Sequence, residues 1–192
     1  MDAMTHALEA LVSKRANYIS DALCEKAIAD LHSALPVAYC QPDNMDVREL
    51  VLNASMIAGM AFTNVSLGIV HSIAHALGGV FHISHGLADA ILLPYVMRAN
   101  SKNDLAAKEK YAATAKKLAV ADMIDMVKQL NRQMEIPRSL SYVIPDEEAF
   151  QKAVPKLAEM ALADGCTKTN PYIPTIGQMQ ELIQDAYKGA GS

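Results

Sequence analysis

Apolar and polar positions follow one another along the chain with the period of an α-helix, not that of a β-strand. Leu, Ala, Met, Glu, Lys and Gln dominate, and no run of strand length alternates polar and apolar residues with β-branched enrichment. The pattern predicts helices at about 4–15, 18–34, 44–64, 67–77, 86–98, 103–118, 121–134, 146–162 and 175–188. We therefore expect an all-α multi-helix bundle in which residues 1–192 form a single domain.

Capping residues, glycines and prolines mark the expected helix ends. N-cap patterns occur at Asp43-Asn44, at Asp146, and at Thr175 with Gln178. The Gly78-Gly79 pair is expected to end one helix. Turns are expected at Pro36, Pro42 and Pro137. Pro94 and Pro155 fall inside helical patterns, and we expect each to kink or interrupt its helix.

Residues 50–88 contain no Asp, Glu, Lys or Arg and are long enough to suggest a membrane span. The same stretch carries Asn53, Asn64, further hydroxyl side chains, four histidines and the glycine pair. These groups are costly in lipid, because nothing there satisfies their polar atoms. A buried core segment is therefore favoured over a membrane helix, which remains the alternative.

The composition of the chain argues against several classes of function and of site. The 17 basic and 21 acidic residues give a net charge of -4, so no basic field attracts nucleic acid or anionic lipid. Cys24, Cys40 and Cys166 are far apart and lack a C-x-x-C pair, which argues against a disulfide framework and against a thiolate metal site. The first residues, MDAMTHALEA, are not those of a secretory signal. We expect a cytoplasmic protein with reduced thiols.

Residues 71–86, HSIAHALGGVFHISHG, place four histidines in a segment without charged residues. On a helix, His71 and His75 lie four residues apart and face the same way. A turn at Gly78-Gly79 would bring His85 opposite His71. Neutral buried imidazoles are good ligands for Fe²⁺ or Zn²⁺, although a single buried histidine is more often a hydrogen-bonded core residue. Four of them favour a metal or catalytic site, because unpaired buried polar groups are expensive.

Asp2 and His6 form a second, weaker pattern. They are also four residues apart, so one helical face would carry a carboxylate and an imidazole together. The alternative is that Asp2 only caps its helix or complements the helix dipole. Combined with the histidine segment, the pair gives a ligand set of the kind that leaves one coordination position open for a substrate oxygen.

Three segments carry a family resemblance: DAMTHALEALVS at 2–13, HSIAHALGGVFHISHGLADAILLPYVMRAN at 71–100 and TNPYIPT at 169–175. They resemble the C-terminal half of the iron-dependent, group III alcohol dehydrogenases, whose helical domain is of the dehydroquinate synthase-like type. The resemblance implies a metal, Fe²⁺ with Zn²⁺ as the alternative, held by Asp2, His6, His71 and His85. It also implies that His75 lies beside the metal and takes part in proton transfer.

Other polar residues near these segments receive plainer interpretations. His82 matches no ligand of the family, and His32 lies in a charged amphipathic helix, where we expect it at the surface. Asp89, Arg98 and Asn100 are interpreted as helix-end or packing groups. Ser84 stands before His85 where many members of the family have proline, which loosens the turn without removing the ligand.

The resemblance does not extend to nucleotide binding. Members of the family also carry a Rossmann-like domain with a glycine-rich turn that holds NAD(P). This chain has no G-x-G-x-x-G pattern, and Leu77-Gly78-Gly79-Val80 is expected to end a helix instead of starting one. We therefore assign no cofactor-binding residues here, and expect NAD or NADP only together with that domain, which is missing from this chain.

These observations leave three functional hypotheses. The first is the metal-binding, substrate-side half of an NAD(P)-dependent enzyme that interconverts primary alcohols and aldehydes, inactive without its nucleotide domain. The second is a helical module without turnover or tight metal binding, and the third is a hydrolase that uses the same side chains to activate water. A face left exposed by a missing domain should be apolar, so homo-oligomers are also expected.

Overall fold

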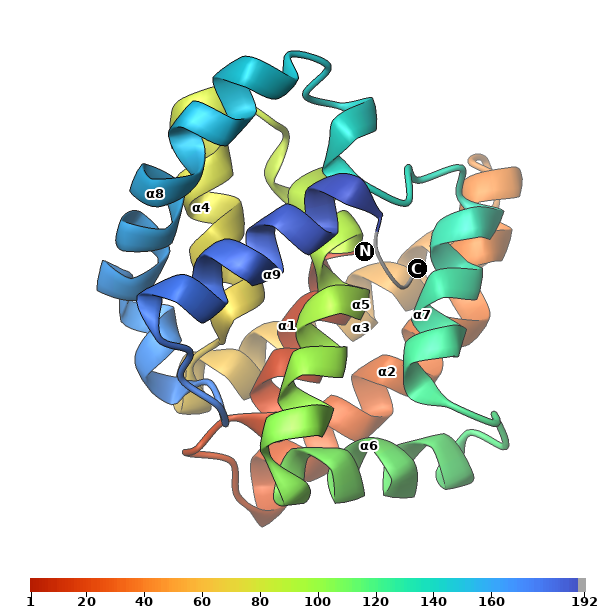
Figure 1. Cartoon of the computed structure of the whole chain (residues 1–192). Coiled ribbons are helices and arrows are strands. Elements are labelled where there is room, and N and C mark those ends of the chain that lie inside the picture. The colour runs from red at the N-terminus through yellow and green to blue at the C-terminus, as the bar shows by residue number, and fades with distance from the viewer. Residues whose placement is uncertain (190–192) are drawn as a thin grey trace.

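The computed structural model describes residues 1–189. Within them lie nine α-helices, two short 3-10 helices and no β-strand (Figure 1). The helices are α1 (Asp2–Val12), α2 (Tyr18–Cys40), α3 (Met45–Val65), α4 (Ile69–Phe81), α5 (His85–Asn103), α6 (Leu105–Lys117), α7 (Met123–Gln133), α8 (Glu147–Ala163), α9 (Ile176–Lys188), η1 (Leu140–Tyr142) and η2 (Gly165–Thr169). The all-α prediction and its nine helices are confirmed, with boundaries that differ by up to six residues.

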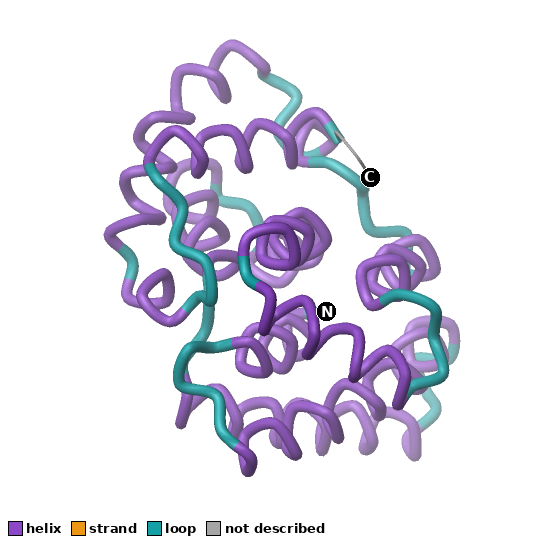
Figure 2. Tube along the Cα trace, turned by 60° about the horizontal axis from the view of Figure 1, so that its bottom comes forward, coloured by secondary structure: helices purple, strands orange, loops and turns teal. Residues whose placement is uncertain are grey.

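Helix α5 lies at the centre of the bundle and packs against α1, α4, α6, α7 and α9. Helices α1, α2 and α3 pack on one another to one side of it, while α4, α8 and α9 pack on the other side. Figure 2 shows that most loops join the helices along the outside of the bundle. The two halves of the molecule therefore meet where α1, α4 and α5 touch.

Helices α1 and α5 pack on each other, and both contribute apolar side chains to the core. Leu8 and Leu11 of α1 and Ile91 and Leu92 of α5 are almost completely buried, and each such side chain contributes about 1.5–3 kcal/mol by leaving water. The first turns of the two helices come so close that a Cβ atom at Gly86 would lie 3.4 Å from the Cβ of Asp2. This packing brings the N-terminal ends of α1 and α5 together.

The predicted helix end at Gly78-Gly79 is wrong. Helix α4 runs through both glycines to Phe81 and ends at His82, whose left-handed backbone (φ 56°) lets its amide donate to the carbonyl of Gly78 at 3.1 Å. A glycine inside a helix costs about 1 kcal/mol relative to alanine. The burial of α4 against α5 and α8 outweighs this cost. Exposed His82 thus serves as the end of a helix.

The predicted turn at Pro36 is also wrong, and Pro94 and Pro155, expected to kink or interrupt their helices, do not interrupt them. Pro36 lies inside α2, which continues to Cys40, and the other two prolines lie inside α5 and α8. Each proline removes a backbone donor and crowds the preceding turn. All three helices are packed against several others, and these contacts hold them together. Local preference alone therefore misplaces the break at Pro36.

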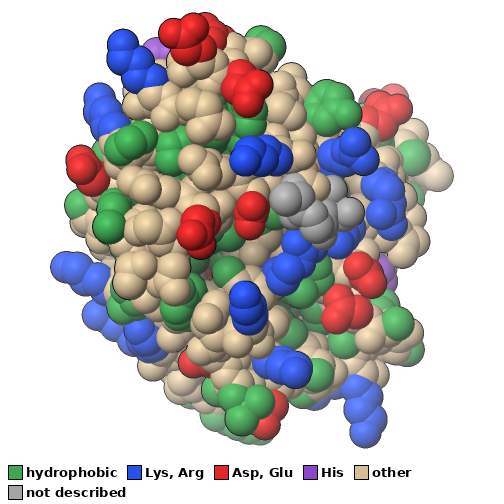
Figure 3. Space-filling view, in the orientation of Figure 1, with side chains coloured by type: hydrophobic (Ala, Val, Ile, Leu, Met, Phe, Trp, Pro, Cys, Tyr) green, Lys and Arg blue, Asp and Glu red, His purple; other side chains and the backbone are tan. Residues whose placement is uncertain are grey.

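The predicted N-caps are present. The side chains of Asn44, Asp146 and Thr175 accept hydrogen bonds from the amides of Val47, Ala149 and Gln178, at 3.3, 2.9 and 3.4 Å respectively. Thr175 and Gln178 form the reciprocal capping box. Figure 3 shows acidic and basic side chains interspersed on one face of the molecule, which agrees with the small net charge.

The uncharged stretch 50–88 is spread over most of α3, all of α4 and the start of α5. Within residues 1–189 no single helix has the length and hydropathy to cross a membrane; α3 and α4 pass that test only as a pair, bent by 101° at their junction. Helix α4 is mostly buried, as predicted. Helix α3 buries only a stripe of small residues, Ala54, Ala58, Ala61 and Val65.

Candidate metal centre

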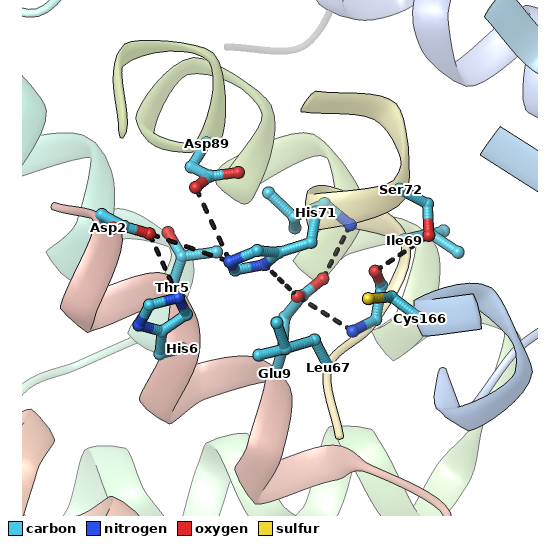
Figure 4. A network of polar contacts seen from close by, with 12 residues as sticks. Asp2, Thr5, His6, Glu9, Leu67, Ile69, His71, Ser72, Asp89 and Cys166 are labelled. Atoms are coloured by element: carbon cyan, nitrogen blue, oxygen red, sulfur yellow. Dashed lines mark hydrogen bonds and ion pairs between the residues drawn. The ribbon is translucent and has the colours of Figure 1, made fainter. Parts of the chain in front are cut away.

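Three helices bring five donor side chains to one place. Asp2 and His6 come from the first turns of α1, His71 from α4, and His85 and Asp89 from the start of α5. Each of the pairs Asp2/His6 and His85/Asp89 is spaced four residues apart, so both members lie on the same face of their helix. Figure 4 shows Asp2, His6, His71 and Asp89 pointing toward one another.

One carboxylate oxygen lies among the three imidazoles. Oδ1 of Asp2 is 3.3 Å from Nε2 of His6, 3.7 Å from Nε2 of His71 and 3.9 Å from Nε2 of His85. Ligands about 2.1 Å from one tetrahedral ion lie about 3.4 Å from each other, so these separations suit a shared metal. The four side chains predicted as metal ligands are thus adjacent in the structure.

The centre also contains buried polar atoms that the described part of the chain leaves without hydrogen bonds. They are Oδ1 of Asp2, Nε2 of His71 and both carboxylate oxygens of Asp89. Leaving such atoms unpaired is costly, and a cation bound among them would remove that cost. Carboxylate and imidazole donors suit Fe²⁺ and Zn²⁺. The residues present therefore fit the metal that the sequence predicts.

Asp89 was interpreted as a packing or helix-end residue, and the structure places it in the first turns of α5 beside the predicted ligands. Its side chain is completely buried, and ligand atoms of Asp2, His71, His85 and Asp89 all lie within 4.8 Å of one another. The sequence contains a hint of this position, because Asp89 follows His85 by one helical turn. His6 stands beside this group of four and contacts it through Asp2.

Glu9 holds His71 in place and was missed in the sequence. Its buried carboxylate accepts hydrogen bonds from the amides of Gly68 (2.9 Å) and Val70 (2.7 Å) and lies 2.6 Å from Nδ1 of His71. The carboxylate thus keeps the proton on Nδ1 and directs Nε2 toward Asp2 (Figure 4). The sequence spacing could have indicated this residue, because Glu9 follows Asp2 by seven residues and so lies on the same face of the helix.

Burial and neighbouring charges shift the pKa values in the centre. Burial alone lowers the pKa of His71, but the carboxylates of Asp2 and Glu9 outweigh it and raise this pKa to about 10. Burial raises the pKa of Asp89 to about 8, whereas contact with His71 lowers that of Asp2. Without metal, protonated His71 is therefore the cation of the cluster. Metal binding must release its proton.

His75 lies at the open side of the centre. Its side chain is 47% exposed, and its ring stacks on that of His85 with centroids 5.3 Å apart. Nδ1 of His75 is 2.8 Å from Oδ2 of Asp164, a carboxylate that also accepts from the amide of Cys166. Burial raises the pKa of the Cys166 thiol to about 12, which opposes a thiolate ligand there. Asp164 therefore orients His75.

Of the remaining residues singled out in the sequence, Asn100 has the packing role expected of it. It is buried, and its Oδ1 accepts a hydrogen bond from Nδ2 of Asn170 at 2.7 Å. His32 is half-buried in α2, although we expected it at the surface. Neither residue belongs to the metal centre.

The described residues form an all-helical domain whose centre gathers carboxylates and imidazoles of the kind that can hold a divalent metal. Residues 1–187 match the family model described as Fe-containing alcohol dehydrogenase family, C-terminal. The chain therefore belongs to the Fe-containing alcohol dehydrogenase family and corresponds to its C-terminal domain. The family resemblance noted in the sequence is confirmed.

Individual relatives agree with this family. The chain is 39% identical to an NADPH-dependent butanol dehydrogenase of Clostridium saccharobutylicum, covering 98% of this chain and 50% of the relative. It is 39% identical to a 1-propanol dehydrogenase of Citrobacter freundii, covering 96% and 53%. The solved iron-containing alcohol dehydrogenase of Thermococcus thioreducens superposes with a TM-score of 0.91 at 34% identity, covering 98% of this chain and 49% of that one. The chain thus spans about half the length of these relatives.

Replacing Glu9 by glutamine tests the support of His71. The neutral amide keeps an oxygen acceptor but loses the charge that holds the Nδ1 proton, so we expect affinity for Fe²⁺ or Zn²⁺ to fall about 10- to 100-fold. Equilibrium competition with a chelator measures this change. Glu159→Gln, the same substitution at an exposed position of α8, is the matched control. Equal affinities in the two variants would show that Glu9 has no influence on the centre.

Proposed function

We propose that this chain is the metal-binding, substrate-side half of an NAD(P)-dependent iron-containing alcohol dehydrogenase that interconverts a primary alcohol and its aldehyde. The observation that carries the proposal is the convergence of Asp2, His6, His71 and His85 in a chain of this family. Relatives named as butanol and 1-propanol dehydrogenases support a small primary alcohol as the substrate.

In this proposal Asp2, His6, His71 and His85 hold Fe²⁺, with Zn²⁺ as the alternative. A bound ion supplies Lewis-acid polarisation of the alcohol or aldehyde oxygen. Glu9 keeps Nε2 of His71 directed at the centre. The rings of Phe62 and His6 lie with their centroids 4.3 Å apart. In this proposal Phe62 covers that side of the metal centre and helps to exclude water.

His75 is proposed to carry the hydroxyl proton between the substrate and solvent. Its ring lies next to those of His71 and His85 and is also half exposed, so it reaches both environments. Asp164 binds Nδ1, which leaves Nε2 as the atom that exchanges the proton. Asp164 is thus a positioning residue for His75.

The nicotinamide that takes up the hydride is assigned to the part of the relatives' length that this chain does not cover. The isolated chain is therefore proposed to bind metal without turning over alcohol. The second candidate is a helical module that neither turns over substrate nor binds metal tightly. It is retained because the chain covers only about half the length of these relatives. Hydrolysis is disfavoured because the two relatives described above are named as dehydrogenases.

The test combines the chain, loaded with Fe²⁺ without oxygen, with butanol and NAD⁺ or NADP⁺. It is assayed alone and after addition of the N-terminal half of the Clostridium saccharobutylicum butanol dehydrogenase. We expect about one equivalent of bound metal and alcohol oxidation only in the mixture, lost in the His75→Ala variant. Metal-dependent ester or amide hydrolysis by the chain alone would favour the hydrolase instead. A chain that binds no metal would be the non-catalytic module.

Helix α3 presents an apolar surface, which supports the proposal that this chain self-associates. Its exposed large side chains are Met45, Leu52, Met56 and Met60, spaced so that they share one helical face. We expect the sedimentation coefficient to rise with concentration, and to stay at the monomer value in a Leu52→Lys, Met56→Lys variant. A wild-type chain that sediments as a monomer at all concentrations would contradict this expectation.

A further inference from the structure

Asp89 differs from the other buried carboxylate of the centre. Glu9 accepts hydrogen bonds from two amides and contacts His71, so its burial is fully compensated. The side chain of Asp89 is 0% exposed, yet neither of its oxygens has a hydrogen-bond partner within residues 1–189. Once ionised, a buried carboxylate in that condition needs a cation close by, because its loss of hydration is otherwise uncompensated.

The position of Asp89 is that of a ligand. Its Oδ2 lies 3.3 Å from Nε2 of His85 and 3.8 Å from Nε2 of His71, the two atoms expected to bind the metal. Helix α5 thus offers the pair His85 and Asp89 in the same way that α1 offers Asp2 and His6. In Figure 4 the ring of His71 points toward both Asp2 and Asp89, the carboxylates of the two pairs.

We propose that Asp89 is itself a metal ligand, so that the centre has two carboxylates and more than four protein donors. This inference rests on the proposed metal binding and adds a statement about selectivity. A second carboxylate neutralises the charge of a divalent ion and supplies a hard oxygen donor. The added oxygen donor raises the affinity for Mn²⁺ and Fe²⁺, which accept more oxygen ligands, by a larger factor than the affinity for Zn²⁺, which is satisfied by four tetrahedral ligands.

The test compares the wild-type chain with Asp89→Asn, which keeps the shape of the side chain and removes its charge. Dissociation constants for Mn²⁺ and Zn²⁺ are measured separately by competition with a chelator. We expect Mn²⁺ affinity to fall at least about 100-fold and Zn²⁺ affinity to fall about 10-fold or less. Losing a metal ligand lowers the affinity more than losing a residue that only hydrogen-bonds to a ligand. Asp46→Asn, at an exposed position of α3, is the control and should change neither constant.

Two further measurements separate the outcomes. In the Co²⁺-loaded chains, visible absorption should intensify in Asp89→Asn, because the coordination number falls. The metal-free variant should unfold at the same or a higher temperature than the wild type, which shows that it folds. A wild-type chain that binds metal, with the Mn²⁺ to Zn²⁺ ratio and the Co²⁺ spectrum unchanged in Asp89→Asn, would overturn this inference alone. A wild-type chain without metal affinity would overturn it together with the proposed metal function.

Discussion

Replacing His71 and His85 together by alanine is expected to abolish metal binding. The affinity for Fe²⁺ or Zn²⁺ should fall by more than about 1,000-fold, because even outer partners of metal ligands contribute about 10- to 100-fold. The two imidazoles come from different helices, and their Nε2 atoms are 3.7 and 3.9 Å from Oδ1 of Asp2. Without them, His6 remains beside Asp2.

The measurement is the metal content of the purified chain, loaded without oxygen, followed by competition with a chelator. His82→Asn is the matched control. It removes an imidazole from the same segment but keeps a residue type that tolerates the left-handed backbone at this helix end. Metal retained in the double alanine variant, or lost equally in His82→Asn, would contradict the assignment of His71 and His85 as ligands.

The metal-free chain is expected to lose stability as the pH rises from about 6.5 to about 10. The pKa of His71 is about 10 in the folded chain, above its ordinary 6.5. Its stabilising contribution is therefore complete below pH 6.5 and disappears as the pH passes the folded value. At about 1.4 kcal/mol per pKa unit, the loss is roughly 3–5 kcal/mol, which lowers the melting temperature by roughly 10 °C.

The carboxyl groups of Asp89 and Asp2 change the stability of the chain at lower pH than His71 does. The folded pKa of Asp89, about 8, lies above its ordinary 3.8, so ionisation of this buried group also destabilises the chain between about pH 4 and pH 8. The pKa of Asp2 is lowered, so its stabilising contribution is present above pH 3.8 and is lost only in stronger acid. Stability without metal should thus be greatest in mildly acidic solution.

Thermal unfolding followed by circular dichroism, with a chelator present, measures this dependence. The His71→Ala chain should show a much smaller change between pH 6.5 and pH 10 than the wild type. His32→Ala removes a histidine outside the metal centre and serves as the control. A wild-type melting temperature that stays constant or rises over this range would contradict the assignment of protonated His71 as the cation of the metal-free cluster.

Short-range features of this chain could be predicted because they depend on neighbours in the sequence. The 3.6-residue period located all nine helices, and the caps at Asn44, Asp146 and Thr175 were correct. Gly78-Gly79 and Pro36 were misplaced as breaks, since the stability of α4 and α2 depends on helices that pack against them. Local preferences of about 1–3 kcal/mol are smaller than the packing of a buried helix.

Some residues of the candidate centre could likewise be predicted from the sequence, whereas others could not. Residue type and spacing singled out Asp2, His6 and the histidines of residues 71–86, and the family resemblance chose Asp2, His6, His71 and His85 among them. The sequence by itself also determined the helical class and the family. Only the tertiary structure revealed Glu9 under His71, Asp164 behind His75 and the unpaired carboxylate of Asp89. The contacts of Glu9 and Asp164 join residues 62 and 89 positions apart. Such contacts exist only once the apolar faces of α1, α4, α5 and α8 have packed, because no local pattern records which distant polar groups that packing buries together.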